Sequence, residues 1–215
     1  QFTTSVNGMV VTVTPKENMT EQAITATLTI KLMKAGAAVD TKTVAISQAG
    51  KIVGSGYVRV TSITSGKKYL IVAENGDKYA VLPASAGLNA SKLFDGIAIT
   101  VANGKIEANA ANNAHAVTIV ASDGAYTIQN TAGKFIEYAN NSSGKTQLAI
   151  VDASSRKWVA DEETAGTFLI KDSEVTGRAL LYRNGDTEYD NRFGGYATSN
   201  IGKGSITVAL YELSE

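Results

Sequence analysis

Tyr126-Thr-Ile-Gln-Asn130 opens the most informative stretch of this chain, which continues through Gly133-Lys-Phe-Ile-Glu-Tyr138 and Trp158 to Gly166-Thr-Phe-Leu-Ile-Lys171. Short runs of aromatic and β-branched residues alternate here with glycine and asparagine, a pattern typical of short β-strands joined by tight turns. Similar pieces recur on both sides of the stretch. The sequence therefore predicts one supersecondary unit that the chain uses more than once.

The repeated piece is an aromatic strand followed by a glycine and a basic residue that open a second apolar strand. The three copies are Tyr57-Val-Arg-Val before Gly66-Lys67, Tyr126-Thr-Ile before Gly133-Lys134, and Phe168-Leu-Ile before Gly177-Arg178. Their short separations fit hairpins. Such pairs also occur in any protein built of β-hairpins, so a threefold repeat and unrelated hairpins are both open interpretations.

Composition limits the classes of function. The 215 residues suffice for one large all-β domain or two smaller ones. Acidic and basic residues balance at 20 each, which argues against a surface that binds nucleic acid or anionic membrane. No apolar run approaches the length of a membrane-spanning helix. Without cysteine, disulfides and thiolate chemistry are excluded.

The compartment is less constrained by composition. A chain without cysteine fits the cytosol, and it also fits large bacterial surface proteins. Abundant Thr, Ser, Asn, Ala and Gly with little charge is typical of exported bacterial β proteins. The sequence begins at Gln1 without methionine, so we expect a mature or trimmed product.

Residues 1 to 50 alternate with period two. Apolar Val11 and Val13, then Ile24 to Ile30, then Val44 and Ile46 are separated by threonine, alanine or serine. This pattern predicts strands with one buried and one wet face. Turns are expected at residues 15–21 and 34–40. Three or four such strands make a thin sheet that needs a second layer.

This segment resembles the later strands of a BACON domain, the immunoglobulin-like module common in surface proteins of gut Bacteroidetes. The resemblance rests on Val11-Thr-Val-Thr-Pro15, Ala26-Thr-Leu-Thr-Ile30 and the ending Thr43-Val-Ala-Ile-Ser-Gln-Ala-Gly50. Ala23 stands where the family usually has arginine, and the family's early strands have no clear counterpart in this sequence. The resemblance implies an immunoglobulin-like sandwich segment over residues 1–52.

Residues 51–56, rich in glycine, are the best candidate linker to a second domain over residues 57–215. About a dozen short apolar runs follow, separated by turn signals such as Asn75-Gly, Asn103-Gly, Asp123-Gly and Asn184-Gly. Helical periodicity is weak throughout. A dozen strands with a threefold pattern fit a β-trefoil, and a flattened barrel or sandwich fits nearly as well.

The second region also resembles a C-terminal β module of secreted Bacteroidetes proteins. The matching residues are Tyr57-Val-Arg-Val-Thr-Ser, Gly66-Lys-Lys-Tyr-Leu-Ile-Val72, Trp158, Phe193-Gly-Gly-Tyr196 and Val208-Ala-Leu-Tyr211. In such proteins the module accompanies enzymes or binding domains. The resemblance implies an accessory role and supplies no catalytic residues.

Catalytic and metal-binding signals are sparse. His115 is the only histidine, so a typical zinc site is not expected. The chain has no Gly-x-Ser-x-Gly elbow, no Walker A loop and no Gly-x-Gly-x-x-Gly motif. Paired carboxylates for glycoside hydrolysis cannot be judged from sequence. We expect no enzyme, no cofactor and no metal.

The most suggestive polar cluster runs from Asn184 to Tyr196. It combines acids, amides, an arginine and aromatic rings, as a sugar site requires: rings stack on the apolar face of a pyranose, and planar polar groups bind its hydroxyls. A solvated hairpin is the plain alternative. Another alternative is a calcium site formed by Asp186, Glu188 and Asp190, although these residues do not follow the EF-hand order.

Two aromatic residues outside this loop are further candidates for a sugar platform. Trp158 is the only tryptophan, and a lone tryptophan in an all-β domain more often anchors the core. Tyr138 begins a polar loop with Asn140 and Asn141, so its ring is the better candidate for exposure.

These observations predict an all-β protein, an immunoglobulin-like sandwich segment followed by a β-trefoil-like or barrel domain. We expect a secreted or cell-surface, non-catalytic accessory protein that binds carbohydrate. The alternative is a structural or adhesive module that contacts protein partners. Six residues are the expected ligand contacts: Tyr138, Tyr189 and Tyr196 by stacking, and Asp190, Asn191 and Arg192 by hydrogen bonds.

Overall fold

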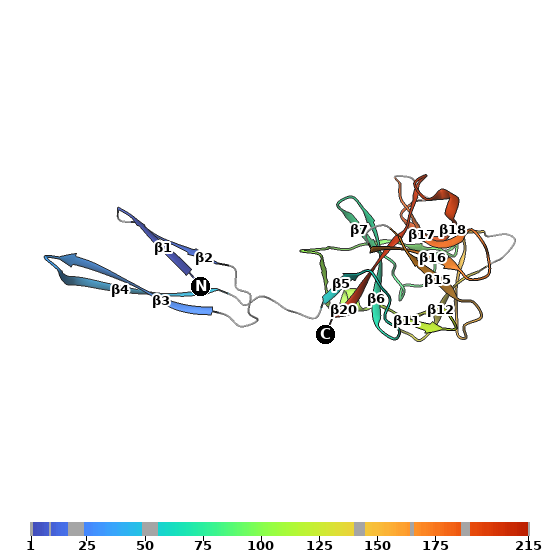
Figure 1. Ribbon diagram of the computed structural model, residues 1–215, viewed down its shortest axis with the longest axis horizontal. Coiled ribbons are helices and arrows are strands. Elements are labelled where there is room, and N and C mark those ends of the chain that lie inside the picture. Colours follow the sequence, from blue (N-terminus) through green and yellow to red (C-terminus); the bar gives the residue numbers. More distant parts are fainter. Residues whose placement is uncertain are drawn as a thin grey trace. The chain divides into compact units, whose positions relative to one another are not determined.

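The computed structural model describes residues 2–8, 10–16, 24–48, 56–139, 145–163, 166–185 and 190–214. The chain divides into two compact units, unit 1 from Gln1 to Gly54 and unit 2 from Ser55 to Glu215 (Figure 1). Both are built of β-strands. In the described part of the chain, the only α-helix is the single turn α1 (Ala110–Asn113). The predicted linker lies outside the described residues except for Gly56, which begins a strand of unit 2.

The described residues of unit 1 form two antiparallel hairpins. The strands are β1 (Phe2–Asn7) paired with β2 (Val10–Pro15), and β3 (Ile24–Lys34) paired with β4 (Ala37–Gln48). The predicted strands are confirmed, and the second turn is tighter than expected because Ala35 and Gly36 take positive φ values of 50° and 81°. The predicted turn at residues 15–21 lies mostly outside the described residues.

The alternation in unit 1 separates apolar residues from threonine on the β3–β4 hairpin. Ile24, Ala26 and Leu28 face across to Gln48, Ile46 and Val44, whereas Thr25, Thr27 and Thr29 pair with Ser47, Ala45 and Thr43. Among the described residues of unit 1, no side chain is fully buried. The apolar face is present as predicted, but four strands do not enclose a core.

Unit 2 holds the remaining strands, which form one antiparallel sheet of sixteen strands within the described residues. In chain order they are β5 (Gly56–Val60), β6 (Lys68–Asn75), β7 (Lys78–Val81), β8 (Phe94–Asp95), β9 (Ile97–Ala98), β10 (Lys105–Glu107), β11 (Val117–Ser122), β12 (Ala125–Asn130), β13 (Phe135–Tyr138), β14 (Leu148–Val151), β15 (Trp158–Glu162), β16 (Thr167–Asp172), β17 (Arg178–Arg183), β18 (Arg192–Ala197), β19 (Ser205–Ile206) and β20 (Val208–Ser214). A 3₁₀ turn, η2 (Thr198–Asn200), follows β18.

Six of these strands pair in a ring: β20 with β6, β6 with β11, β11 with β12, β12 with β15, β15 with β16, and β16 with β20. Three excursions leave the ring between β6 and β11, between β12 and β15, and between β16 and β20. They contain the pairs β7–β9, β13–β14 and β17–β18. The ring therefore has a threefold pattern of connection.

Two of the three sequence copies form the expected hairpins. The hairpins β12–β13 and β16–β17 contain the second and third copies. The first copy was assigned one strand too early, because β5 and β6 are not neighbours and β20 lies between them. By its place in the ring the matching strand is β6, with Tyr69-Leu-Ile followed by Gly76 and β7.

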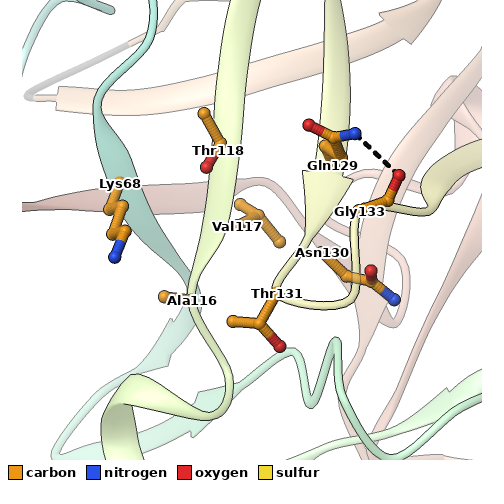
Figure 2. Close-up of a pocket in the computed structure, with 8 residues that line it drawn as sticks. All are labelled: Lys68, Ala116, Val117, Thr118, Gln129, Asn130, Thr131 and Gly133. Atoms are coloured by element: carbon orange, nitrogen blue, oxygen red, sulfur yellow. Dashed lines mark hydrogen bonds between the residues drawn. The ribbon is translucent and has the colours of Figure 1, made fainter.

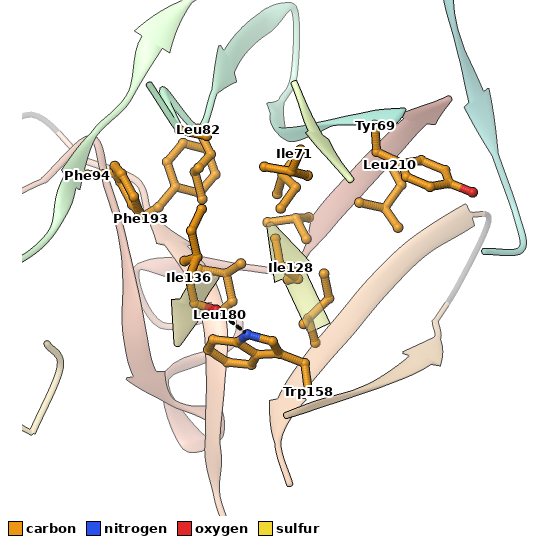
Figure 3. Close-up of a cluster of buried hydrophobic side chains, with 14 of the residues drawn as sticks. Tyr69, Ile71, Leu82, Phe94, Ile128, Ile136, Trp158, Leu180, Phe193 and Leu210 are labelled. Atoms are coloured by element: carbon orange, nitrogen blue, oxygen red, sulfur yellow. Dashed lines mark hydrogen bonds between the residues drawn. The ribbon is translucent and has the colours of Figure 1, made fainter. Parts of the chain in front are cut away.

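The main core lies inside this ring. Ile71, Ile128 and Ile170 occupy corresponding positions on β6, β12 and β16 and are all buried. Leu82 and Leu180 pack with them from the adjoining segments: the Leu82 nitrogen donates to the Ile71 carbonyl at 2.9 Å, and Leu180 is paired with Ile170. Figure 3 shows Ile71, Leu82, Ile128 and Leu180 of this cluster.

Trp158 anchors the same core, as predicted. Its side chain is 1% exposed, and its indole nitrogen donates to the Ile136 carbonyl at 2.8 Å (Figure 3). Because the indole N–H has a hydrogen-bond partner inside the protein, burial of Trp158 leaves no unpaired donor. Trp158 presents no ring face to a ligand.

Candidate functional site

The first candidate site is an open pocket of about 490 Å³ on unit 2, within the size range of small-molecule sites. Three segments line it: the β6–β7 hairpin, the connection through β9, and the facing ends of β17 and β18. The lining residues are Ala73, Asn75, Asp77, Lys78, Tyr79, Ala80, Gly96, Ala98, Ile99, Tyr182 and Asn191. We call this the Tyr79 pocket.

The β6–β7 hairpin supplies most of the pocket's polar groups. Asn75 and Lys78 are paired across a two-residue turn in which Gly76 has a φ of 65°. Glycine adopts that value without strain, so the turn can be tight. Asn75, Asp77 and Lys78 are exposed, and Tyr79 is half-buried beside them. One wall therefore presents an amide, a carboxylate and an ammonium group. Tyr79 is paired with Glu74 on the other face of the hairpin, and its side chain packs against the apolar cluster that contains Leu70 and Tyr211.

Asn191 closes the opposite wall. It has a φ of 61°, a left-handed conformation that asparagine tolerates. Its Oδ1 accepts from the Tyr182 hydroxyl at 3.1 Å, and its Nδ2 donates to the Gly185 carbonyl at 3.2 Å. These bonds fix the amide at the pocket wall. Burial raises the pKa of Tyr182, so its hydroxyl remains a donor at neutral pH.

Gly96 permits the close approach of these groups. Its nitrogen donates to the Asn191 carbonyl at 2.8 Å. A Cβ at this position would lie 2.8 Å from Tyr182 Cε2 and 3.1 Å from the Asn191 carbonyl oxygen. The two walls therefore meet where only a residue without a side chain fits.

Three other predicted contacts gather on the outer face of β17 and β18. Arg183 Nε donates to Asp190 at 2.7 Å, and Arg192 Nε pairs with Asp95 at 3.0 Å. Tyr196 lies on the same face, and the charges of Arg183, Arg192, Asp190 and Asp95 all act on its hydroxyl. Asp190, Arg192 and Tyr196 thus lie near one another, while Asn191 lines the Tyr79 pocket.

Tyr196 is not placed to stack on a sugar. Its side chain is 3% exposed, and its hydroxyl has no hydrogen-bond partner among the described residues. Burial raises the pKa of this hydroxyl to about 12. The ring packs with Ala179 and Leu181 in a small apolar cluster. Its face is therefore covered by protein.

The expectation that Tyr138 has an exposed ring is wrong. The side chain is 4% exposed, and its hydroxyl donates to the Lys145 carbonyl at 2.9 Å. A Cβ added at Gly195 would collide with this ring, and the Arg156 guanidinium lies 5.9 Å from the ring centroid. The Tyr138 ring therefore packs directly on the backbone of β18 at Gly195 and is covered by protein.

Tyr189 lies outside the described residues, together with Asp186 and Glu188 of the calcium alternative. In the described part of the chain, no group of three or more potential metal-ligating side chains occurs. His115 is half-buried, and burial lowers its pKa. It is thus largely neutral at pH 7, and the chain has no second histidine to share a metal with it.

A second, smaller pocket of about 260 Å³ lies beside the β12–β13 turn (Figure 2). Its lining includes Lys68, Thr118, Gln129, Asn130 and Thr131, and no aromatic side chain. Gln129 Nε2 donates to the Gly133 carbonyl at 2.6 Å, and Asn130 Oδ1 accepts from the Lys134 nitrogen at 2.9 Å. These amides hold the turn, which makes the pocket a weaker candidate.

Sequence reasoning did not find Asn75, Asp77, Lys78 and Tyr79. The signal was the Asn75-Gly turn followed by a basic residue and a tyrosine, which indicated no more than a hairpin. These residues lie far in sequence from Asn191. The pairings of β6 with β7 and of β7 with β9, and the backbone bond between Gly96 and Asn191, bring them together.

No helix in the described ranges is long and apolar enough to cross a membrane. Comparisons of the chain with models of protein families, with curated proteins and with solved structures found no match.

Proposed function

We propose that this chain is a non-catalytic accessory module that binds carbohydrate through the Tyr79 pocket. The observation that carries the proposal is an open pocket in which exposed amide and carboxylate groups lie beside the apolar residues Ala80, Ala98 and Tyr182. Sugar recognition needs an apolar surface together with planar hydrogen-bonding groups. The pocket combines both on rigid strands and a tight turn.

Each group has a distinct role in the proposed site. Ala80, Ala98 and the edge of Tyr182 supply the apolar surface for a pyranose ring, and Asp77 accepts hydrogen bonds from sugar hydroxyls. Asn75 and Asn191 supply amides. The bond from Asn191 to Gly185 uses one of its two amide hydrogens, which leaves the other for a hydroxyl.

The pocket chemistry supports binding without catalysis. Among the described residues that line it, Asp77 is the only carboxylate. Most glycoside hydrolases use a pair of carboxyl groups about 5 to 10 Å apart. A single carboxylate in an open pocket suits hydrogen bonding to a hydroxyl. The proposal requires neither a cofactor nor a metal.

For the architecture, we propose that unit 2 is a β-trefoil-like barrel. The six-stranded ring, its three excursions and the corresponding Ile71, Ile128 and Ile170 support this assignment. For unit 1 we propose an immunoglobulin-like sandwich segment of the BACON type, supported by two hairpins with one apolar face each. The resemblances and the composition favour a secreted or cell-surface protein of a Bacteroidetes bacterium.

The test is a glycan-array screen of the full chain, followed by titration of the best glycan against variants. Asp77→Ala should weaken binding about tenfold, or about 1.4 kcal/mol, because it removes the carboxylate that accepts hydrogen bonds from the sugar. Asp152→Ala is the matched control, since Asp152 is also exposed and lies outside the pocket. Equal affinities of both variants for the glycan would refute the site.

Adhesion to a protein partner is a second candidate function, and a different observation favours it. Most of the large apolar side chains that are exposed in the described structure belong to unit 1: Val6, Val10, Ile30, Leu32, Met33, Val39 and Val44. Clustered exposed apolar residues mark interaction surfaces. A silent glycan array with folded protein would favour this candidate.

A further inference from the structure

Unit 1 contains a groove between its two hairpins. The first hairpin contributes Thr4, Val6, Gly8 and Val11, and the second contributes the consecutive residues 28–32 of β3. Side chains alternate across a strand, so a groove lined by consecutive residues follows the strand's edge as well as one face. Val6 and Leu32 at this groove are 71% and 64% exposed.

The groove meets an unpaired strand edge. Within the described residues, β3 pairs only with β4, and β1 pairs only with β2. A contact between the hairpins is made by Gln48, whose Nε2 donates to the Lys16 carbonyl at 2.8 Å. Two-stranded sheets are marginal alone and gain stability when a further strand is added. An open edge beside an apolar groove is the geometry of β-strand addition.

Charge distinguishes between occupants of the groove. In the sequence, residues 1–54 carry five lysines against the three acids Glu17, Glu21 and Asp40, so basic residues are in modest excess. Lys31 itself lines the groove. A second copy of this chain would bring lysine against lysine, which disfavours self-pairing. A partner strand that carries carboxylates would meet these lysines with the opposite charge.

We propose that unit 1 binds an extended segment of a partner protein in which apolar and acidic residues alternate. The segment pairs its backbone with the edge of β3, and its apolar side chains enter the groove over Val6, Ile30 and Leu32. Its carboxylates lie on the other side, near Lys31. The backbone supplies affinity and the alternation supplies specificity.

The test uses the full chain and labelled peptides of about eight residues, the length of a long strand. One peptide alternates valine and glutamate, a second alternates valine and lysine, and a third contains the residues of the first in two blocks. Fluorescence anisotropy should show saturable binding of the Val-Glu peptide, at least about tenfold tighter than the others, and weaker binding when salt screens the charges.

Variants of the chain test where the peptide binds and whether lysine selects its charge. Leu32→Ser should weaken the binding of the Val-Glu peptide several-fold. Val120→Ser, at an exposed apolar residue of unit 2, should leave that binding unchanged. Lys31→Glu should reverse the preference toward the Val-Lys peptide. Because these side chains are exposed, the variants should keep the wild-type circular dichroism.

Three results would overturn the proposal: no peptide binding to folded protein, equal binding of alternating and block peptides, or a concentration-dependent dimer whose formation Leu32→Ser abolishes. The last result would assign the groove to a second copy. None of these outcomes bears on glycan binding by unit 2.

Discussion

Single residues set the shape of the Tyr79 pocket, and Gly96 is the clearest case. Its missing side chain allows Tyr182 and the Asn191 backbone to approach each other. Gly96→Ala should destabilise the protein by about 1–3 kcal/mol, because the added methyl group must displace a buried ring. Urea unfolding measures this loss. Ala98→Ser, at an exposed neighbour in the same pocket, should stay within about 0.5 kcal/mol of wild type.

Two buried tyrosines differ in whether their hydroxyl has a partner. The Tyr138 hydroxyl donates to the Lys145 carbonyl, while the Tyr196 hydroxyl has no partner among the described residues. Tyr138→Phe should therefore cost about 0.5–1.5 kcal/mol, and Tyr196→Phe should be neutral or stabilising. Thermal or urea unfolding of both variants tests the contrast. A clear loss for Tyr196→Phe would reveal a partner that the described residues do not include.

At the scale of strands, a buried ion pair stabilises the β15–β16 hairpin. Asp172 accepts from Arg156 Nη2 at 2.6 Å and from the Val175 nitrogen at 2.6 Å, and its side chain is 1% exposed. Asp172→Ala should cost about 3–5 kcal/mol, because it leaves Arg156 partly buried and less compensated. The exposed pair of Lys134 with Asp152 is the control, and Asp152→Ala should cost less than about 1 kcal/mol. If urea unfolding showed similar losses of unfolding free energy for both variants, the distinction between the buried and the exposed ion pair would be contradicted.

The pairing of β6 with β20 should make stability depend on pH in alkaline solution. Burial, followed by the hydrogen bond to Glu212, raises the pKa of Tyr69 from 10.0 to about 12. The folded state therefore holds this proton more tightly, so the stabilisation is complete below pH 10 and is lost as the pH rises toward 12. Tyr69→Phe should reduce the slope of unfolding free energy against pH in this range. An unchanged slope would show that Tyr69 does not titrate as described.

For the whole molecule, the two units should differ in local stability. Unit 2 encloses a large core, whereas the described residues of unit 1 include no fully buried side chain. We expect backbone amides of β3 and β4 to exchange with solvent much faster than those of β6, β11 and β12. Hydrogen exchange followed by mass spectrometry measures this. Equal protection in both units would mean that unit 1 is covered in solution, for example by self-association.

Much of the fold follows from local pattern. Period-two alternation predicted the strands of unit 1, and Asp123-Gly124, both with positive φ, predicted the β11–β12 hairpin. Trp158 was expected in the core for its size and rarity. The first repeat was misplaced because Tyr57 and Tyr69 both head aromatic strands before a glycine, and only non-local pairing with β20 distinguishes them.

The site was harder to predict, for a physical reason. Adjacent strand residues point to opposite faces, so the predicted cluster was divided once β18 formed. Arg192 and Tyr196 lie on the outer face, and Phe193 enters the core. Asn191 alone among the described members reached the pocket, where it meets residues from a distant hairpin.

The central claim is that the Tyr79 pocket binds carbohydrate, and nuclear magnetic resonance mapping tests it most directly. The ¹⁵N-labelled full chain would be titrated with the glycan selected by the array. The account predicts saturable shifts of the amides of residues 75–80, 96–99 and 191, which Asp77→Ala weakens. Shifts confined to other surfaces, such as the pocket of Gln129 and Thr131, would contradict it.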